Sequence, residues 1–180
     1  MSSITDELAR LHELSGAEFS RQVVCIAKRH EFHPVPGETG IFSAGEEQGE
    51  DYEWLLHAAR KAVQHGYCVF ILPNPQGIRT ADFIFERKGI YRLYDLKTIH
   101  GKASVTNRLT ESIGQSNRVL LNMVTDYSPS ALARSIKHYF EINNDAREVM
   151  IFKGKKLISI MREDTLGNSY FRYFISKYVK

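Results

Sequence analysis

Two aspartates and a lysine within one short stretch have the types and spacing of a divalent-ion site. Residues 80–99 hold two apolar, aromatic-rich runs separated by Lys88-Gly89, a pattern that predicts a β-hairpin with a tight turn. A two-residue turn there makes residues whose numbers add up to 177 face each other, which sets Asp82 opposite Asp95 with Cβ atoms about 5 Å apart. Lys97 follows two residues later, on the same face as Asp95. Because two like charges that face each other destabilise a hairpin unless a cation or a shared proton relieves them, the pair predicts a metal site.

Triplets of the form acid-x-Lys also arise by chance, so each copy has to be weighed by its place in the chain. Glu86-Arg87-Lys88 lies at the predicted hairpin tip, where charged residues are ordinarily solvated, and we do not assign the site to it. Asp95-Leu96-Lys97 lies inside an aromatic and aliphatic strand whose partner carries Asp82. The alternative for this second triplet is a structural Asp–Lys ion pair at a sheet edge.

The elements that must position these residues form a series of helices followed by alternating strands and helices. Apolar residues at helical spacing predict helices at 4–14, 17–30, 50–65, 104–117 and 128–143. Apolar runs bounded by turn residues predict strands at 67–72, 81–86, 90–96, 118–124, 149–152 and 157–161, and residues 169–180 fit a strand or a helix equally. This order predicts one mixed sheet with packed helices, an α/β or α+β fold. We expect residues 1–45 to form accessory helices and a loop, and residues 46–180 to form the functional domain.

Length and composition predict a globular protein that builds its own hydrophobic core. A chain of 180 residues needs neither disulfides nor structural metals to fold. Cys25 and Cys68 lie far apart in apolar runs, so we expect buried free thiols and a reducing compartment. The sequence shows no secretory h-region and no apolar run of membrane-spanning length, which predicts a cytosolic protein with no membrane contact. The net charge of +3 permits a polyanionic partner without requiring one, and the basic residues gather toward the C-terminus.

The acids and the lysine resemble the motif of the PD-(D/E)xK nuclease superfamily. In that family a helix acid, a strand aspartate and an acid-x-Lys triplet on the next strand form one site, which Asp82 and Asp95-Leu96-Lys97 match. Ala81 stands where the proline of the family name is expected. The stretches GEDYEWLLHAARKAVQHGYCVFILPN, RTADF and YDLKT are also similar to toxin domains at the C-termini of contact-dependent growth inhibition (CdiA) proteins and to related phage or mobile-element nucleases. The resemblance covers about residues 50–117.

This resemblance implies a restriction-endonuclease-like fold with a divalent cation in its site. Asp82, Asp95 and the backbone carbonyl of Leu96 would bind the cation, and Glu53 would complete the site directly or through water. Glu50, one turn earlier in the same helix, is the alternative helix acid. Hard oxygen ligands of this kind suit Mg²⁺ or Mn²⁺.

Further roles are expected for the side chains around the site. Lys97 would orient the attacking water or stabilise the charge that builds on phosphorus. Arg79 and Thr80 precede the hairpin and are expected to touch phosphate, and Thr98 and His100 follow Lys97. Gln115 and Arg118 end the helix at 104–117, where related nucleases place a Gln or a basic residue toward the site. These predicted substrate contacts are Arg79, Thr80, Thr98, His100, Gln115 and Arg118.

Three functions remain open from the sequence. The first is a metal-dependent endonuclease acting on tRNA, another RNA or DNA, with an immunity-type inhibitor as a further partner. The second is a metal-independent ribonuclease of the barnase–EndoU–RelE type, which would use Lys97, Thr98 and His100 and take the RNA 2′-OH as its nucleophile. The third is a non-catalytic nucleic-acid-binding module, whose signature is binding with a steep salt dependence and no turnover.

Overall fold

The predicted hairpin is formed in the computed structural model, which describes residues 2–45, 50–101 and 104–180. Strands β4 (Phe83–Arg87) and β5 (Ile90–Ile99) pair in antiparallel fashion, with Phe83 opposite Tyr94. This register is the one that the two-residue turn predicts. Lys88 and Gly89 both have positive φ, 53° and 80°, as a type I′ turn requires at its two central positions.

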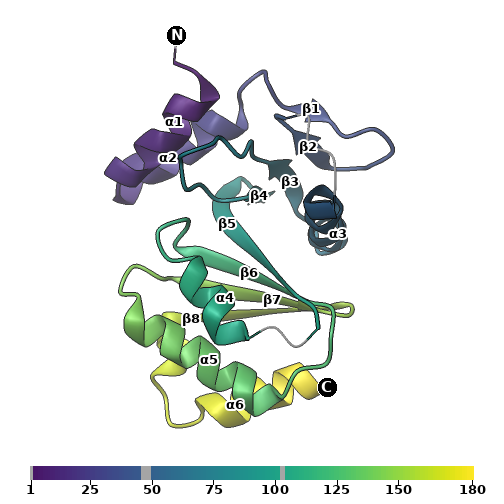
Figure 1. The fold of residues 1–180 in the computed structure, drawn as a ribbon, viewed down its shortest axis with the longest axis vertical. Coiled ribbons are helices and arrows are strands. Elements are labelled where there is room, and N and C mark those ends of the chain that lie inside the picture. Colours follow the sequence, from purple (N-terminus) through teal and green to yellow (C-terminus); the bar gives the residue numbers. More distant parts are fainter. Residues whose placement is uncertain (1, 46–49, 102–103) are drawn as a thin grey trace. The chain divides into compact units, whose positions relative to one another are not determined.

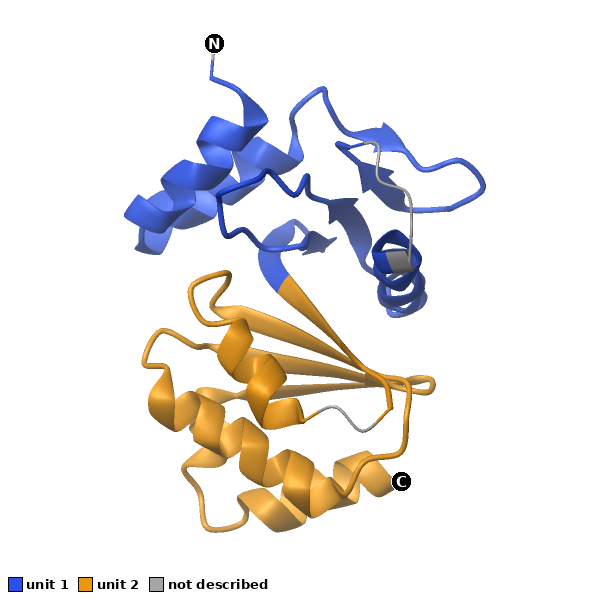
Figure 2. Ribbon diagram, in the orientation of Figure 1, with its two compact units in different colours: residues 1–94 blue, residues 95–180 orange. Residues whose placement is uncertain are grey.

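The chain forms two compact units that divide after Tyr94, within β5 (Figure 1, Figure 2). Unit 1 comprises residues 1–94 and unit 2 residues 95–180. Backbone pairing follows the sequence order from β1 to β8, so the described residues form a mixed eight-stranded sheet with helices, and the predicted α/β class is confirmed. The expected organisation into accessory residues 1–45 and a functional domain at 46–180 stays a prediction.

Unit 1 packs two N-terminal helices and α3 with four short strands. Its elements are α1 (Ile4–Arg10), the 3₁₀ turn η1 (Leu11–Glu13), α2 (Gly16–Ala27), β1 (His33–Pro34), β2 (Ile41–Ser43), α3 (Glu50–Gln64), β3 (Cys68–Ile71) and β4. Strand β2 pairs parallel with β3, and the other neighbours pair antiparallel. Buried side chains from both helices and the hairpin, among them Leu8, Ile26 and Ile84, form a hydrophobic cluster that holds the unit together.

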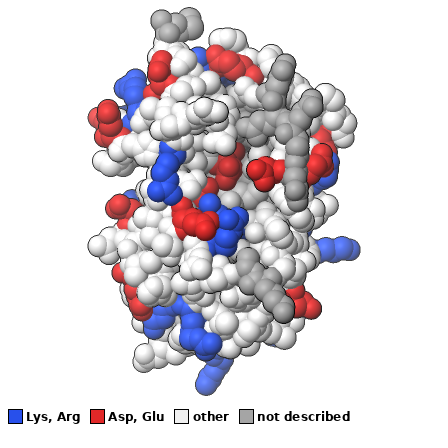
Figure 3. Space-filling model, viewed as in Figure 1, with Lys and Arg blue, Asp and Glu red and all other residues white. Residues whose placement is uncertain are grey.

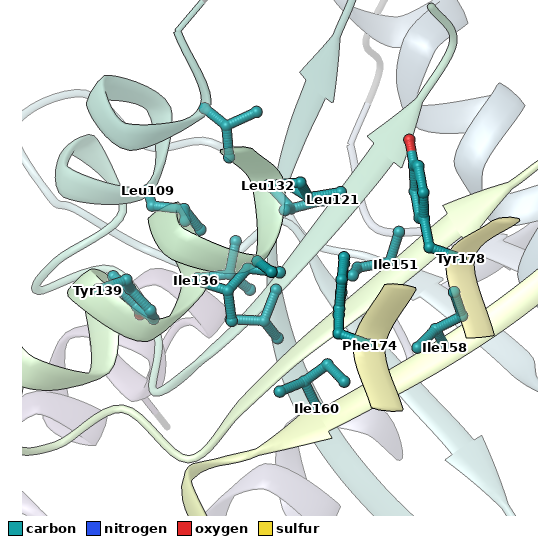
Figure 4. Close-up of a cluster of buried hydrophobic side chains, with 14 of the residues drawn as sticks. Leu109, Leu121, Leu132, Ile136, Tyr139, Ile151, Ile158, Ile160, Phe174 and Tyr178 are labelled. Carbon is teal, nitrogen blue, oxygen red and sulfur yellow. The ribbon is translucent and has the colours of Figure 1, made fainter. Parts of the chain in front are cut away.

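Unit 2 has helices on one face of a sheet formed by the second half of β5 and three further strands (Figure 2). Its other elements are α4 (Val105–Glu111), β6 (Arg118–Met123), α5 (Pro129–Ile142), β7 (Glu148–Lys153), β8 (Lys156–Met161), the 3₁₀ turn η2 (Arg162–Thr165) and α6 (Tyr170–Val179). Strands β5, β6 and β7 are parallel and β8 is antiparallel to β7. Figure 4 shows the core between the sheet and the helices, where Leu121 and Ile151 meet Ile136 and Phe174.

Several elements differ from those predicted. Residues 33–34 and 41–43 form strands where a loop is expected, and the predicted first helix breaks at Arg10 into a 3₁₀ turn. The helix predicted at 104–117 ends at Glu111. Residues 170–179 resolve the open choice in favour of a helix, because Tyr170, Phe174 and Tyr178 are buried at helical spacing.

The expectation of two buried thiols is wrong. Both cysteines are free, but Cys25 is exposed and Cys68 is half-buried. Cys25 lies beside the buried stripe of α2 rather than on it, since Val23 and Ile26 take the inward positions. Cys68 begins β3 on the less buried face of that alternating strand.

In the described parts of the chain, no helix has both the length and the apolar character needed to cross a membrane.

Candidate functional site

Asp95 and Lys97 form an ion pair on the second half of β5. The Lys97 Nζ lies 3.3 Å from Asp95 Oδ2, and the two residues are only 8% and 1% exposed. The parallel register sets Asp95 beside Val119 and Lys97 beside Leu121 of β6, and both partners belong to the core under the helices. Because side chains paired across strands point to the same face, the acid and the amine face the helix side of unit 2.

Other polar side chains accompany Asp95 on this face. Burial raises the pKa of the Tyr139 phenol on α5. Hydrogen bonds with Ser112 and Asn143 lower this pKa in part, whereas the negative charge of the nearby Asp95 raises it further. Asn143 donates its side-chain N–H to the Tyr139 hydroxyl over 3.3 Å. The Asp95 carboxylate therefore lies close enough to this phenol to act on it electrostatically, and its ion pair with Lys97 is the contact that compensates its charge.

The carbonyl of Leu96 points away from β6. Carbonyl directions alternate along a strand, and the carbonyl of Ile99 accepts a hydrogen bond from Val124 N–H on the β6 side, with an N···O distance of 3.0 Å. Leu96, an odd number of residues earlier, therefore directs its oxygen to the opposite edge of β5.

Asp82 belongs to unit 1, where backbone hydrogen bonds hold it directly before β4. Its N–H donates to the Tyr94 carbonyl at 3.0 Å, and its own carbonyl accepts from Leu72 N–H at 2.9 Å. The side chain is half-buried. Asp82 thus immediately precedes the Phe83–Tyr94 pair, whose register is described above.

Glu53, the predicted helix acid, lies on the solvent side of α3. The buried face of that helix is formed by small and branched side chains: Leu55, Leu56, Ala58, Ala59 and Ala62. Glu53 is exposed, as is Arg60, whose pKa is raised mainly by its hydrogen bond with Glu38. Glu50, the alternative helix acid, is the first residue of α3.

The predicted substrate contacts are dispersed. Arg79 and His100 are exposed, Thr80 is half-buried and Thr98 is buried on the face opposite Lys97. Gln115 lies beyond the end of α4 and donates its amide N–H to the Glu111 carbonyl, so its expected place at the end of the helix is wrong.

Arg118 belongs to a buried polar group that the sequence does not indicate. Its guanidinium donates to Glu148 Oε1 at 2.6 Å, and Ser159 donates its hydroxyl to the other carboxylate oxygen. Glu148 is 2% exposed. The signal available in the sequence is a charged residue at the start of an apolar strand, but the parallel pairing of β6 and β7 is needed to bring Arg118 beside it.

The donor chemistry of the predicted ligand set fits a hard divalent cation, since it consists of two carboxylates and a carbonyl. The described residues contain no group of three or more His, Cys, Asp or Glu side chains that could hold a metal ion.

A pocket of about 440 Å³ lies elsewhere, in unit 1, beside His30, His33 and Tyr52. None of the predicted site residues lines it. On the face drawn in Figure 3, basic and acidic side chains of the described residues are interspersed, with neither sign covering a large area.

No protein-family model and no curated protein matches this sequence. Among solved structures, the chain is similar to a CdiA-CT/CdiI toxin and immunity complex from Burkholderia pseudomallei. The identity is 16%, the TM-score is 0.43, and the match covers 72% of this chain and 97% of the other. A similarity at this level does not bear on the activity or the partners of the present chain.

Proposed function

We propose that this protein is a metal-dependent nuclease that hydrolyses phosphodiester bonds of RNA or DNA. The observation that carries the proposal is the buried pair formed by Asp95 and Lys97, two residues apart on β5 with 3.3 Å between Nζ and Oδ2. An acid and an amine at this spacing suit phosphoryl chemistry, because one binds a cation and the other stabilises negative charge. The motif resemblance described above agrees with this assignment.

Asp82, Asp95 and the carbonyl of Leu96 would hold Mg²⁺ or Mn²⁺, with Glu53 acting through water from its exposed position. When bound, such a cation supplies Lewis-acid stabilisation of charge on the scissile phosphate. Asp82 directly precedes the Phe83–Tyr94 pair of the hairpin, which supports its inclusion in this proposed ligand set.

Lys97 would act on the substrate through its ammonium group. Asp95 keeps that group in place on the strand, and burial limits its motion. The ammonium is then positioned to orient an attacking water or to stabilise the developing phosphorane charge. His100 and Arg79, both exposed, remain proposed substrate contacts.

The 1% exposure of Asp95 favours a second candidate function, a nucleic-acid-binding module in which the pair is structural. A carboxylate this deeply buried beside an ammonium can serve the fold alone. Such a protein binds nucleic acid in a salt-dependent manner and does not turn it over.

Cleavage assays of the full chain on tRNA and on plasmid DNA test the proposal. With Mg²⁺ or Mn²⁺ present, Asp95→Asn and Lys97→Ala should each lower the cleavage rate by about 10²- to 10⁴-fold. Asp51→Asn and Lys28→Ala, which change exposed residues of the same types, are matched controls and should cleave like wild type. Circular dichroism of each variant verifies that the fold is retained.

Chelation of divalent cations with EDTA distinguishes the metal-dependent nuclease from the metal-independent ribonuclease and from the binding module. Loss of wild-type cleavage in EDTA and its return with Mg²⁺ or Mn²⁺ support the metal-dependent reaction. RNA cleavage that persists in EDTA favours the 2′-OH mechanism. Salt-dependent binding without cleavage under any condition would leave only the binding module, and near-wild-type rates in both site variants would refute the assigned residues. Any toxin role and a cognate immunity protein remain proposals that depend on activity being found.

A further inference from the structure

Four lysines gather where α6 ends against the β7–β8 hairpin of unit 2. A pocket of about 360 Å³ is lined there by Lys156, Lys177 and Lys180 together with Leu157, Ile158 and Ser176. Lys153 belongs to the same end of the hairpin, since its Nζ and that of Lys156 each lie 3.2 Å from the Tyr178 carbonyl oxygen. Of the residues that the structure describes, no Asp or Glu side chain lines this pocket.

Lys153 and Lys156 contact the Tyr178 carbonyl, and Lys153 also lies 3.8 Å from the centre of the Tyr178 ring, but Lys177 and Lys180 add further positive charge beside them. The carbonyl end of a helix carries about half a negative charge, which one ammonium group is enough to offset. Within the described chain, none of the four lysines forms an ion pair with a carboxylate. Asp126 acts on the Tyr178 phenol in this region, where it adds to the rise in pKa that burial causes. A concave site with excess fixed positive charge attracts polyanions.

An exposed aromatic ring adjoins the pocket. Lys177 Nζ lies 5.5 Å from the centre of the Tyr173 ring, and Tyr173 is 42% exposed although the inward-facing aromatics of α6, Phe174 and Tyr178, are fully buried (Figure 4). Lysines beside an exposed aromatic face are typical of surfaces that bind single-stranded nucleic acid, where phosphates contact the amines and an unpaired base stacks on the ring.

We propose that this pocket and Tyr173 form a binding site for single-stranded nucleic acid, with the lysines on consecutive phosphates and the tyrosine under a base. The choice of nucleic acid as the polyanion rests on the proposed function. The site is separate from the Asp95–Lys97 pair in sequence and in chemistry, and it is defined wholly within unit 2. In this proposal, helix α6 contributes to binding of the nucleic-acid substrate.

Fluorescence anisotropy with the full chain in EDTA tests the site without turnover. The probes are a labelled 20-nucleotide DNA strand, a 2′-O-methyl RNA strand and the corresponding DNA duplex. Lys156→Gln/Lys177→Gln/Lys180→Gln should raise Kd for both single strands by about 10- to 100-fold near 0.1 M salt and lower the salt slope by about 2. The control Arg21→Gln/Lys28→Gln/Arg134→Gln removes the same charge from exposed positions and should stay within about threefold of wild type.

Two further variants protect the test against unfolding and non-specific charge effects. Lys177→Gln/Lys180→Gln leaves the Lys156 contact with the Tyr178 carbonyl intact. It should still weaken single-strand binding, by less than the triple variant does. Tyr173→Ser should weaken single-strand binding about 5- to 100-fold while leaving duplex binding and the salt slope nearly unchanged.

Equal effects of the pocket and control triples, or binding of anionic lipid vesicles without binding of either strand, would overturn the proposal. If cleavage is found but the pocket triple binds like wild type, the nuclease assignment stands and this site is wrong. If no cleavage is found but the pocket triple loses binding, this site stands without the nuclease.

Discussion

The Asp95–Lys97 pair is held by the same burial that makes it costly to disturb. With 1% and 8% of their surfaces exposed, each residue depends on the other to compensate its charge. Strand alternation places both on the helix side, so neither can turn to solvent without disrupting the core. At the scale of single residues, the proposed chemistry and the stability of unit 2 therefore depend on the same two side chains.

Removing one partner should cost more stability than removing both. Lys97→Met leaves a buried carboxylate without its cation, and we expect it to lower the free energy of unfolding by about 3–5 kcal/mol. Asp95→Asn/Lys97→Met removes both charges and should recover at least half of that loss. Urea denaturation followed by circular dichroism measures both values. A single variant within about 0.5 kcal/mol of wild type would mean that the two charges do not compensate each other in solution.

At the scale of elements, the β4–β5 turn sets the register on which the proposed metal ligands depend. Gly89 has φ of 80°, and a Cβ added there would meet no atom within 4 Å. Gly89→Ala should therefore destabilise the protein by about 1 kcal/mol through backbone strain alone. Gly167→Ala, at a glycine without positive φ and with similar space, should be nearly neutral in the same urea titration. Equal effects of the two substitutions would contradict the type I′ geometry.

Two tyrosines of α6 should respond in opposite ways to loss of the hydroxyl. The Tyr170 hydroxyl donates to the Ala133 carbonyl at 2.8 Å, whereas the buried Tyr178 hydroxyl has no hydrogen-bond partner among the described residues. We expect Tyr170→Phe to lower stability by about 1 kcal/mol, and Tyr178→Phe to leave it unchanged or raise it by about 1 kcal/mol. Thermal and urea unfolding at neutral pH compare them, and a clear loss for Tyr178→Phe would reveal a partner for its hydroxyl.

Tyr170 and Tyr178 also determine how the free energy of unfolding changes at alkaline pH. Burial raises the pKa of both phenols, with Asp164 adding to the rise at Tyr170 and Asp126 at Tyr178. Above about pH 10 the unfolded chain loses these protons while the folded chain keeps them, so the free energy of unfolding falls as pH rises. Each Phe variant should make this decline shallower when urea midpoints are compared between pH 9 and 11.

The sequence predicts elements well where a local signal sets them. The Lys88-Gly89 turn, the helix predicted at 128–143 and the strands predicted at 149–152 and 157–161 all appear in the structure close to their predicted places. Strands β1 and β2 are not predicted from the sequence, because they are two and three residues long and such short strands are defined by their pairing rather than by a residue pattern. The ion pair of Arg118 with Glu148 is not predicted for the same reason, since only the parallel register of β6 and β7 brings the two residues together.

At the scale of the whole molecule, each unit has a hydrophobic cluster built from its own residues. Ile26 belongs to the cluster of unit 1 and Ile136 to that of unit 2, and both are fully buried. The register of the proposed site follows from the first half of β5, whereas the ion pair follows from the second half. Each half of β5 is thus stabilised by a different core.

This division predicts that local opening follows the units. Ile26→Ala and Ile136→Ala remove the same buried atoms and should each cost about 2–5 kcal/mol within the unit that loses them. In native-state hydrogen exchange, Ile136→Ala should accelerate the amides of β6 and β7 more than those of α2, and Ile26→Ala should do the reverse. Since the two substitutions are chemically identical, each serves as the control for the other. Uniform acceleration in both variants would show that the chain opens as one cooperative body, and would tie the stability of the ion pair to the N-terminal helices as well.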